Sequence, residues 1–340
     1  WCTGTTSTAQ GQLSKGDFWV YFDNGKPEIA LRTEDGSLTA ADPPRGTLSG
    51  QRLSPEYQEI ADEFLKTTDE VKGGEAYLKA RDAMKAFRVY KTTGDVAPLR
   101  EYLTYNIINN KISAVKFVEP DELSGYGKPA EYSVDDPEYV GKPVPKRVSF
   151  SVNLYDKTTN LEFVGGDLRV DTIDFASAPM LETVGGSLSG YSLTSAPMLK
   201  SVGMGLTADN LTSAPMLESV GGSASLSGLT SAPMLKTVGG QLYVDELTSA
   251  PMLESVGGRL SAENLTSAPV LKTVGGVLHA IELNSAPMLE TVGGSLNSTE
   301  LTSAPMLETV GGSLRANRLN SAPMLETVGG SLLSGNLTSA

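Results

Sequence analysis

The titratable residues of the chain offer little that could perform catalysis. His279 is the only histidine, and no Ser/His/Asp or Cys/His set can be built around it. The sequence contains no C-x-x-C, H-E-x-x-H or P-loop motif, and no G-x-G-x-x-G after an expected strand. The acidic runs at 121–122 and 135–138 carry oxygen ligands that a cation accepts. Acidic loops in water have the same composition, so we assign no metal, cofactor or catalytic residue and expect no enzyme.

Side chains suited to binding gather at a few positions of a repeated sequence. Copies of a near-constant segment, commonly LTSAPMLETVGGSL, differ mainly in the four residues that follow it. The first variable column holds Ser189, Thr207, Ser225, Tyr243, Ser261, His279, Asn297, Arg315 and Leu333. The third holds Tyr191, Asp209, Ser227, Asp245, Glu263, Ile281, Thr299, Asn317 and Gly335. The fourth is polar and includes Glu246, Glu282, Glu300 and Arg318.

The second variable column is small or apolar and is expected to point inward: Gly190, Ala208, Leu226, Val244, Ala262, Ala280, Ser298, Ala316 and Ser334. Because alternate residues of a strand face opposite sides, the first and third columns should share the outer face of one sheet. A constant frame with one variable outer face is typical of binding surfaces in repeat proteins. Relaxed drift would also scatter into other exposed positions, yet the TSAP segment hardly changes. The predicted binding face comprises Tyr191, Asp209, Tyr243, Asp245, Glu263, His279, Ile281, Arg315 and Asn317.

Another column alternates in charge from one repeat to the next: Glu182, Lys200, Glu218, Lys236, Glu254, Lys272 and Glu290. Opposite charges on neighbouring rungs contribute roughly 0.2–1 kcal/mol per pair, and like charges are unfavourable. We therefore interpret the alternation as a device that fixes the stacking register. It fails at Glu290, Glu308 and Glu326, where three acids follow one another. These acids either result from recent duplication of the repeat or bind a cation or a basic partner.

Hydroxyl side chains form two further columns. One contains Thr183, Ser201, Ser219 and Thr237, and the other contains Thr194, Thr212, Thr230 and Thr248. Flat threonine arrays suit ice binding only when two columns lie side by side on one face. Here the adjacent Thr and Ser residues should face opposite sides, so we expect structural hydrogen-bonding ladders.

These columns exist because the second half of the chain repeats with a fixed period. Nine prolines recur with a period of 18 residues: Pro179, Pro197, Pro215, Pro233, Pro251, Pro269, Pro287, Pro305 and Pro323. A fixed period of this length is typical of a solenoid, in which each coil buries its apolar side by stacking on its neighbours.

One coil can be interpreted from residues 181–198. Its apolar residues are Leu181, Val184, Leu188, Leu193, Ala196 and Met198, which we expect to stack on their own kind. The Gly185–Gly186 pair supplies either a turn with positive φ or a close backbone approach. Pro197 marks a second corner of the coil, where the backbone needs no N–H group to donate a hydrogen bond to a neighbouring strand. Short parallel strands are expected at 181–184 and 187–191.

The order L-x-x-V-G-G-x-L-x-(small)-x-x-L-x-x-A-P over residues 161–340 resembles leucine-rich-repeat solenoids. It is most similar to the short coils of receptor L domains and of bacterial and phage surface proteins. That resemblance implies a right-handed coil, but a turn of about 18 residues leaves no room for a helix on the convex side. A left-handed hexapeptide helix has coils of the same length and is the alternative. Its aliphatic position should recur at every sixth position, which Leu193 and Leu199 obey but Gly205 does not.

Residues 1–118 are expected to form a small α+β domain. A β-hairpin is expected around Asp23-Asn24-Gly25, and a second turn at Asp35-Gly36. Ser54-Pro55-Glu56 carries the signals of a helix start. A second helix over 75–90, a short third one near Pro98 and a strand over 112–118 complete the domain.

Residues 119–147 contain five prolines and many acids, and we interpret them as an extended linker. The β-solenoid follows at 148–340. Its first segment, 148–156, alternates strictly between apolar and polar residues, which predicts a capping strand over the first coil. The last coil ends at 337–340 without a visible cap. We expect further repeats there, or an oligomer that covers this end.

Charge and composition exclude some partners. Residues 151–340 carry eight basic and 17 acidic side chains, and the whole chain has a net charge of −13. Nucleic-acid binding requires a basic surface, so a nucleic-acid partner is not expected. The sequence contains no run of about 18 apolar residues, the length that a membrane-spanning helix needs, so membrane insertion is not expected. Cys2, the only cysteine, cannot form an internal disulfide.

The sequence therefore predicts a non-enzymatic recognition or adhesion protein. Its variable face would bind a protein or glycan, in an extracellular, cell-surface or virion location. One alternative is a structural spacer or fibre component of a phage tail or surface appendage. Another is an effector whose unknown activity lies in residues 1–150 and is targeted by the solenoid.

Overall fold

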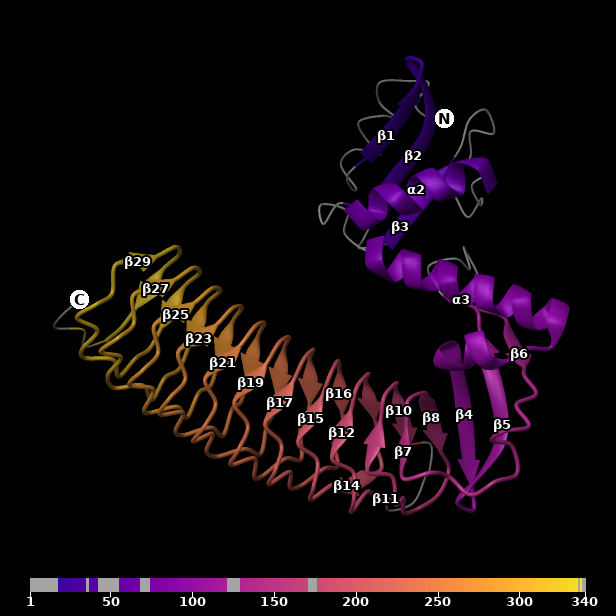
Figure 1. The fold of residues 1–340 in the computed structure, drawn as a ribbon. Helices are drawn as coiled ribbons and strands as arrows, with labels where there is room; N and C mark the ends of the chain where they lie inside the picture. Colours follow the sequence, from indigo (N-terminus) through magenta and orange to yellow (C-terminus); the bar gives the residue numbers. More distant parts are fainter. Residues whose placement is uncertain are drawn as a thin grey trace. The chain divides into compact units, whose positions relative to one another are not determined.

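The computed structural model describes residues 18–34, 37–41, 55–67, 74–120, 129–170, 176–335 and 337. The chain divides into two units (Figure 1). One contains Trp1–Leu103 and Lys116–Asp135, and the other contains Thr104–Val115 and Asp136–Ala340. The predicted class, an α+β region followed by a parallel β-solenoid with coils of the predicted length, is confirmed.

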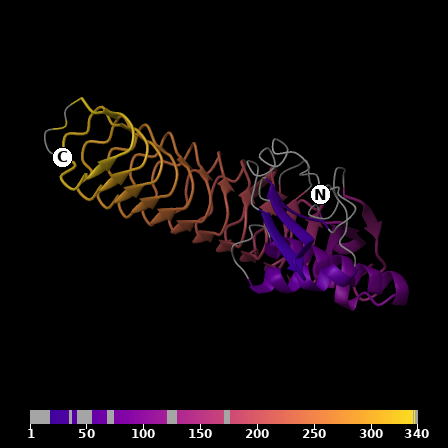
Figure 2. The same cartoon turned by 90° about the horizontal axis from the view of Figure 1, so that it is seen from above.

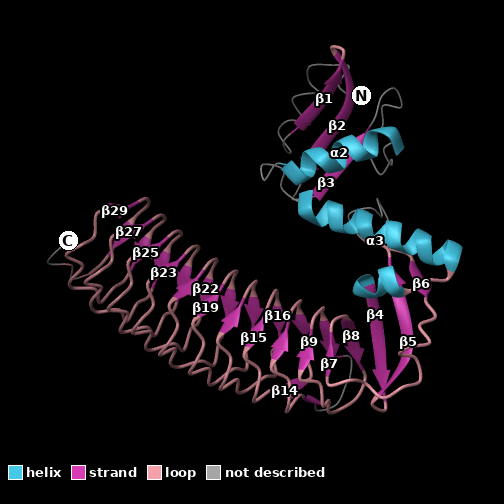
Figure 3. Ribbon diagram, viewed as in Figure 1, coloured by secondary structure: helices cyan, strands magenta, loops and turns pink. Residues whose placement is uncertain are grey.

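The solenoid is built from short strands that alternate between two parallel sheets, as Figure 3 shows. The first, here called the leucine sheet, contains β8 (Ser151–Leu154), β10 (Leu168–Val170), β13 (Leu188–Ser189), β16 (Leu206–Thr207), β18 (Ala224–Ser225), β20 (Leu242–Tyr243), β22 (Leu260–Ser261), β24 (Leu278–His279), β26 (Leu296–Asn297), β28 (Leu314–Arg315) and β30 (Leu332–Leu333). The second, the valine sheet, contains β7 (Arg147–Val148), β9 (Phe163–Val164), β12 (Thr183–Val184), β15 (Ser201–Val202), β17 (Ser219–Val220), β19 (Thr237–Val238), β21 (Ser255–Val256), β23 (Thr273–Val274), β25 (Thr291–Val292), β27 (Thr309–Val310) and β29 (Thr327–Val328).

A third side closes each coil, so that the coils stack as the closed loops visible in Figure 2. It begins with β11 (Ala176–Ser177) and β14 (Leu193–Ser195), which pair in parallel. Further along, single bridges replace the strands and join serines of neighbouring coils, such as Ser195 to Ser213 and Ser213 to Ser231. The Ala-Pro-Met-Leu turn follows, in which the N–H of Leu199 donates to the carbonyl of Ala196 at 3.2 Å.

Stacked apolar columns form the core of the solenoid. Leu181, Val184, Leu188, Leu193 and Ala196 are each at most 1 % exposed. Their equivalents in the later coils stack on them in register, as in the pairs Val184–Val202 and Leu188–Leu206. Burial of this kind stabilises by roughly 25 cal/mol per Å² of apolar surface. The spacing of these positions is irregular and does not follow the regular period of the hexapeptide alternative.

The first glycine of each pair is required by close contact between coils, whereas the second position holds Met204 in one coil. A Cβ at Gly203 would lie 2.0 Å from the carbonyl oxygen of Gly185, and one at Gly221 would lie 2.0 Å from that of Gly203. Among the described glycines, positive φ occurs at Gly25, Gly94 and Gly141, all outside the repeats. Of the two explanations that the sequence left open, the close backbone approach is therefore correct.

Two details of the predicted coil are wrong. The strands span only two residues each in most coils, at 183–184 and 188–189, because tight turns occupy the neighbouring positions. Met198 does not belong to the core, since it is 40 % exposed. The turn that begins at Ala196 directs Leu199 inward and leaves the methionine on the outside.

The first coils are extended by a strand that the sequence interpretation missed. β4 (Leu103–Ile108) pairs in parallel with β8 through Thr104–Ile107. β5 (Lys111–Val118) then follows β4 in the same sheet. The segment 148–156 is thus not the capping strand of this sheet, because β4 covers its edge. In the valine sheet, by contrast, β7 is the terminal strand.

The other unit combines a three-stranded antiparallel sheet with helices. β1 (Phe18–Asp23), β2 (Lys26–Glu34) and β3 (Ser37–Ala41) form the sheet. The expected hairpin turn is present, with positive φ at Asn24 and Gly25, whereas the turn at 35–36 lies outside the described residues. The helices are α2 (Pro55–Thr67), α3 (Gly74–Thr93) and the 3-10 helix η1 (Ala97–Tyr102). Ile29, Leu31, Ala61, Leu65 and Tyr77 form its buried cluster.

The predicted linker is folded over much of its described length. β6 (Glu131–Ser133) pairs antiparallel with Lys116–Val118 of β5. Tyr132 stacks against Phe87, with ring centroids 4.7 Å apart. Within the solenoid unit, the N–H of Val144 donates to the carbonyl of Asn110. Pro137 begins a turn and Pro143 forms a β-bridge with Lys111. The division into 1–118, 119–147 and 148–340 does not match the two units.

Candidate functional site

The first variable column lies on the outer surface of the leucine sheet. Each of its residues is the second residue of a two-residue strand, and successive members are in register, as in Ser225–Tyr243 and Tyr243–Ser261. From Ser189 to Arg315 the residues on either side of each member are buried, for example Leu242 and Val244 beside Tyr243. The inward direction predicted for the second column is therefore confirmed, and the first column faces outward.

The third variable column lies in the turn that follows each strand, and not on the strand itself as predicted. Two contacts nevertheless place it beside the first column. The Ser225 hydroxyl donates to Oδ1 of Asp209 at 2.7 Å, and Nε2 of His279 lies 3.6 Å from Oε1 of Glu263. In both pairs a side chain of the third column contacts a first-column side chain on the next coil. The two columns therefore form one surface, here called the variable face.

His279 is the centre of the most connected group on the variable face. Besides Glu263, it meets Asn297 on the following rung, where Nδ2 of Asn297 lies 3.0 Å from Nδ1 of His279. The imidazole is half-buried, whereas the Glu263 side chain is 61 % exposed. The group holds hydrogen-bonding atoms in fixed positions at the surface, which suits recognition of a polar ligand.

The remaining predicted residues lie separately along the face. Tyr191 and Tyr243 are 63 % and 37 % exposed, and each lies on a different coil. Asp245, Arg315 and Asn317 are exposed, and Ile281 is half-buried. The nine residues thus form a strip along the coils and not a single pocket. The Tyr243 hydroxyl donates to Oε1 of Gln241, a neighbour that the sequence interpretation did not single out.

The charge column forms discrete pairs. Nζ of Lys200 lies 2.9 Å from Oε2 of Glu182, and Nζ of Lys236 lies 2.9 Å from Oε2 of Glu218. The hydrogen bond and the positive charge of Lys200 lower the pKa of Glu182. Each of these lysines binds the glutamate of the preceding coil. One ion pair therefore joins the coils of Glu182 and Lys200, and the other joins the coils of Glu218 and Lys236. Glu254, Lys272 and Glu290 occupy the next positions of the same column.

The column begins earlier than the sequence interpretation recognised. Glu162 lies one coil before Glu182, and Lys146 lies one coil before Glu162. Nζ of Lys146 is 2.8 Å from Oε1 of Glu162. The register Arg147–Phe163–Thr183 places them in line with Glu182. The coils there have different lengths, which concealed the match. A further inter-coil ion pair, outside the charge column, joins Arg318 to Glu300 in the fourth variable column.

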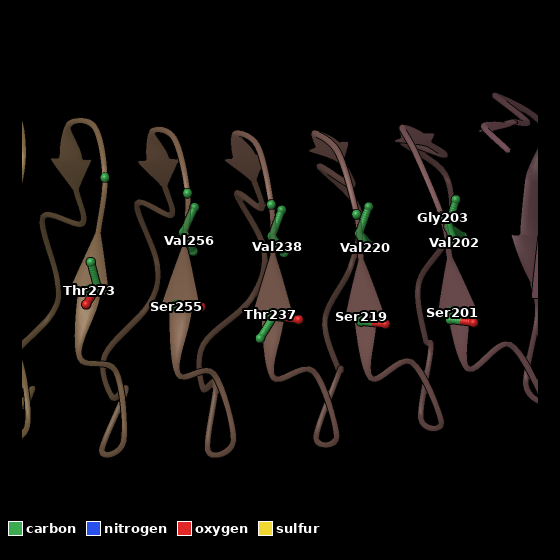
Figure 4. A pocket seen from close by; sticks show the side chains of 14 residues that line it. Ser201, Val202, Gly203, Ser219, Val220, Thr237, Val238, Ser255, Val256 and Thr273 are labelled. Atoms are coloured by element: carbon green, nitrogen blue, oxygen red, sulfur yellow. The ribbon is translucent and has the colours of Figure 1, made fainter. Parts of the chain in front are cut away.

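The two hydroxyl columns differ in role. Thr230 and Thr266 donate to the carbonyls of Thr212 and Thr248 at 2.9 Å, which confirms a structural ladder there. The other column lines a groove along the outside of the valine sheet, shown in Figure 4. Its hydroxyl side chains come from Ser201, Ser219, Thr237, Ser255 and Thr273, and the neighbouring glycines leave the groove open.

Within the acidic run at 135–138, Asp136 has a structural role. Asp136 is fully buried and accepts a 2.7 Å hydrogen bond from the Tyr105 hydroxyl and a second one from the N–H of Glu138. Its oxygens therefore stabilise the surrounding turn. Residues 121–122 lie outside the described part of the chain. Among the residues that the structure describes, no group of three or more His, Cys, Asp or Glu side chains is arranged to hold a metal ion.

Comparisons of the chain with protein-family models, curated proteins and solved structures gave no match. In the described helices, none has the length and apolar character needed to cross a membrane. The geometry on its own thus defines the class: a β-solenoid repeat protein with an outward variable face.

Proposed function

We propose that this protein is a recognition or adhesion protein that binds a protein or glycan on the variable face. The observation that carries the proposal is the confinement of sequence variation. The first and third variable columns share one outer surface, whereas the residues that build the coil remain nearly constant. Repeat proteins use such a constant frame to present varied side chains.

The residue types on the variable face favour a role in ligand binding over a role as a structural spacer. Tyrosine and arginine are enriched among residues that dominate binding energy, because they combine large contact area with hydrogen bonds. Tyr191, Tyr243 and Arg315 are exposed there, and His279 adds a group with two ring nitrogens. A purely structural spacer requires no such set, although the regular stacking of the coils also suits that role.

We further infer that the coils are of the leucine-rich type found in receptor L domains and in bacterial and phage surface proteins. Support comes from the leucines that stack inward at 181, 188 and 193 and at the equivalent positions of most later coils, with Ala224 as an exception in the column of Leu188. An extracellular, cell-surface or virion location follows from that relationship and belongs to the same proposal.

The test uses the full chain on arrays of glycans and of surface proteins. We expect at least one ligand to bind, and the variant Tyr243→Ala/His279→Ala/Arg315→Ala to weaken its binding by about tenfold or more. The matched control is Thr248→Ala/Asn284→Ala/Thr302→Ala, three exposed side chains on the same part of the solenoid but outside the variable face.

Both variants should retain the circular dichroism spectrum of the parent chain. Equal losses in the two variants would contradict the assignment of the binding face. Absence of any ligand on both arrays would remove the recognition proposal and favour the structural spacer.

A further inference from the structure

An exposed column of methionines follows the proline corner of the solenoid. It contains Met180, Met198, Met216, Met234, Met252, Met288, Met306 and Met324, which are 37–46 % exposed, with Val270 in the remaining coil. We call it the methionine stripe. The exposure is nearly constant along the column, so it is a property of the turn and not of the end of the solenoid.

The backbone holds the stripe in place. In the coil that contains Met306, the N–H of Leu307 donates to the carbonyl of Ala304 at 3.2 Å and closes the turn. Leu307 is fully buried, so the residues on both sides of it, Met306 and Glu308, are exposed. The charge column therefore runs beside the methionine stripe along the length of the solenoid.

Such a surface is unusual on a protein exposed to water. Scattered apolar side chains need no explanation, but a contiguous apolar strip marks an interaction site. Methionine is flexible and polarizable, and methionine-rich surfaces adapt to different apolar partners. The near-invariance of the methionine contrasts with the variable face, where the residue changes from coil to coil.

The charge column indicates what the partner carries. From Glu182 to Lys272 the charges alternate, so that part is neutral overall. Glu290, Glu308 and Glu326 are then held in one column by backbone hydrogen bonds of 2.9 Å, from Glu308 N to Glu290 O and from Glu326 N to Glu308 O. Like charges on adjacent rungs are unfavourable. A cationic group beside Met288, Met306 and Met324 would relieve this repulsion.

We propose that the methionine stripe docks a cationic amphipathic segment of a partner protein, with its basic side chains over Glu290, Glu308 and Glu326. A helix of about 18 residues is about 27 Å long, and neighbouring coils are about 4.7–4.9 Å apart. A helix of that size therefore covers the coils from Met234 to Met324. This site is separate from the variable face, and the proposal does not depend on the function assigned to that face.

The probe is a labelled helical peptide of leucine and lysine, of about 18 residues, with all leucines on one face. Two control peptides have the same length: one has the same composition in scrambled order, and one has serine in place of leucine. Binding to the full chain is measured by fluorescence anisotropy at low and high salt. We expect only the amphipathic peptide to bind tightly, and less tightly at high salt.

The decisive variants are Met288→Gln/Met306→Gln/Met324→Gln and Glu290→Gln/Glu308→Gln/Glu326→Gln. Each should weaken binding by about tenfold or more. The matched control is Met180→Gln/Met198→Gln/Met216→Gln, which changes the same turn in coils with alternating charge and should lower the affinity about threefold at most. Thermal unfolding checks that all three variants remain folded.

Three outcomes would overturn the proposal. Equal binding of the serine peptide would show attraction by charge alone. Equal binding of the scrambled peptide would show that amphipathic order is irrelevant. Equal loss in the control variant and in the Met288/Met306/Met324 variant would show that the acidic coils do not define the site.

Discussion

The carbonyl oxygen of Gly221 lies 2.0 Å from the point where a Cβ of residue 239 would stand. The same relationship recurs between Gly239 and Gly257, and along the rest of the column. Coils can approach to this distance only when the position carries no side chain. The glycine column thus sets how closely the coils stack.

Gly239→Ala should therefore destabilise the solenoid by about 1–3 kcal/mol or more, because the coil must move away from its neighbour. Gly205→Ala is the matched control. Its Cβ would meet atoms only at 3.7 Å, which is ordinary van der Waals contact. Thermal and urea unfolding of both variants provide the comparison. A Gly239→Ala protein as stable as the parent would show that the coils tolerate separation.

Leu217 and Met216 are adjacent, yet the first is fully buried and the second is 38 % exposed. Leu217→Ala should lower the free energy of unfolding by about 2–5 kcal/mol, because it leaves a cavity in the stacked core. Met216→Ala should change it by less than about 0.5 kcal/mol. Urea unfolding measures both. Similar losses in the two variants would mean that the methionine turn packs inward in solution.

Glu308→Lys would restore the alternation of the charge column. We expect it to stabilise the solenoid by roughly 0.4–2 kcal/mol, from two cross-rung pairs of about 0.2–1 kcal/mol each. High salt should reduce the gain, since these charges are exposed. Lys236→Glu is the reverse change and should destabilise. If the two variants have the same melting temperature, the column has no role in stacking.

The pKa of Glu182 should respond to Lys200. The hydrogen bond and charge of Lys200 lower this pKa from the ordinary value of 4.5. A carboxyl with a lowered pKa in the folded state stabilises the protein above the unfolded pKa, and this contribution is lost as the pH falls through the lowered folded value. A carboxyl-detected NMR titration should show the Glu182 pKa returning to its ordinary range in Lys200→Met. An unchanged value would mean that the ion pair does not persist in solution.

The constancy of the repeat explains why the solenoid was predictable. Leu188, Val184 and their equivalents recur at one spacing, and each must stack on the next copy, so the periodicity defined the core columns directly. The glycine pair was harder, because sequence alone cannot distinguish positive φ from a close backbone approach. Met198 was assigned to the core on its apolar character, whereas the turn geometry decides its direction.

The region before the repeats was less predictable, since its contacts join segments far apart in the chain. β4 pairs in parallel with β8, in a register that sets Asn106 beside Asn153. Asn109 and Asn110, both with positive φ, separate two apolar runs and were the available hairpin signal. The prolines of 119–147 suggested an extended linker, although Asp136 within it is buried.

On the variable face, the sequence predicted which columns point outward and which point inward. It did not predict that the third column lies in a turn and contacts the next coil. That offset arises because the strands are only two residues long, which the hydrophobic pattern alone does not reveal. The contacts of His279 with Glu263 and Asn297 follow from it.

The identity of successive junctions between coils has a consequence at the level of the gene. Nearly every coil presents the next with the same leucine, valine and glycine positions, at a constant offset along the chain; Met204 at the second glycine position and Ala224 in the leucine column are exceptions. Recombination between repeats that adds or removes the codons of one repeat would therefore insert or delete one whole coil and keep the register of the remaining junctions. Natural variants that differ in length by whole coils would remain folded, and each gained or lost coil would lengthen or shorten the variable face by one rung.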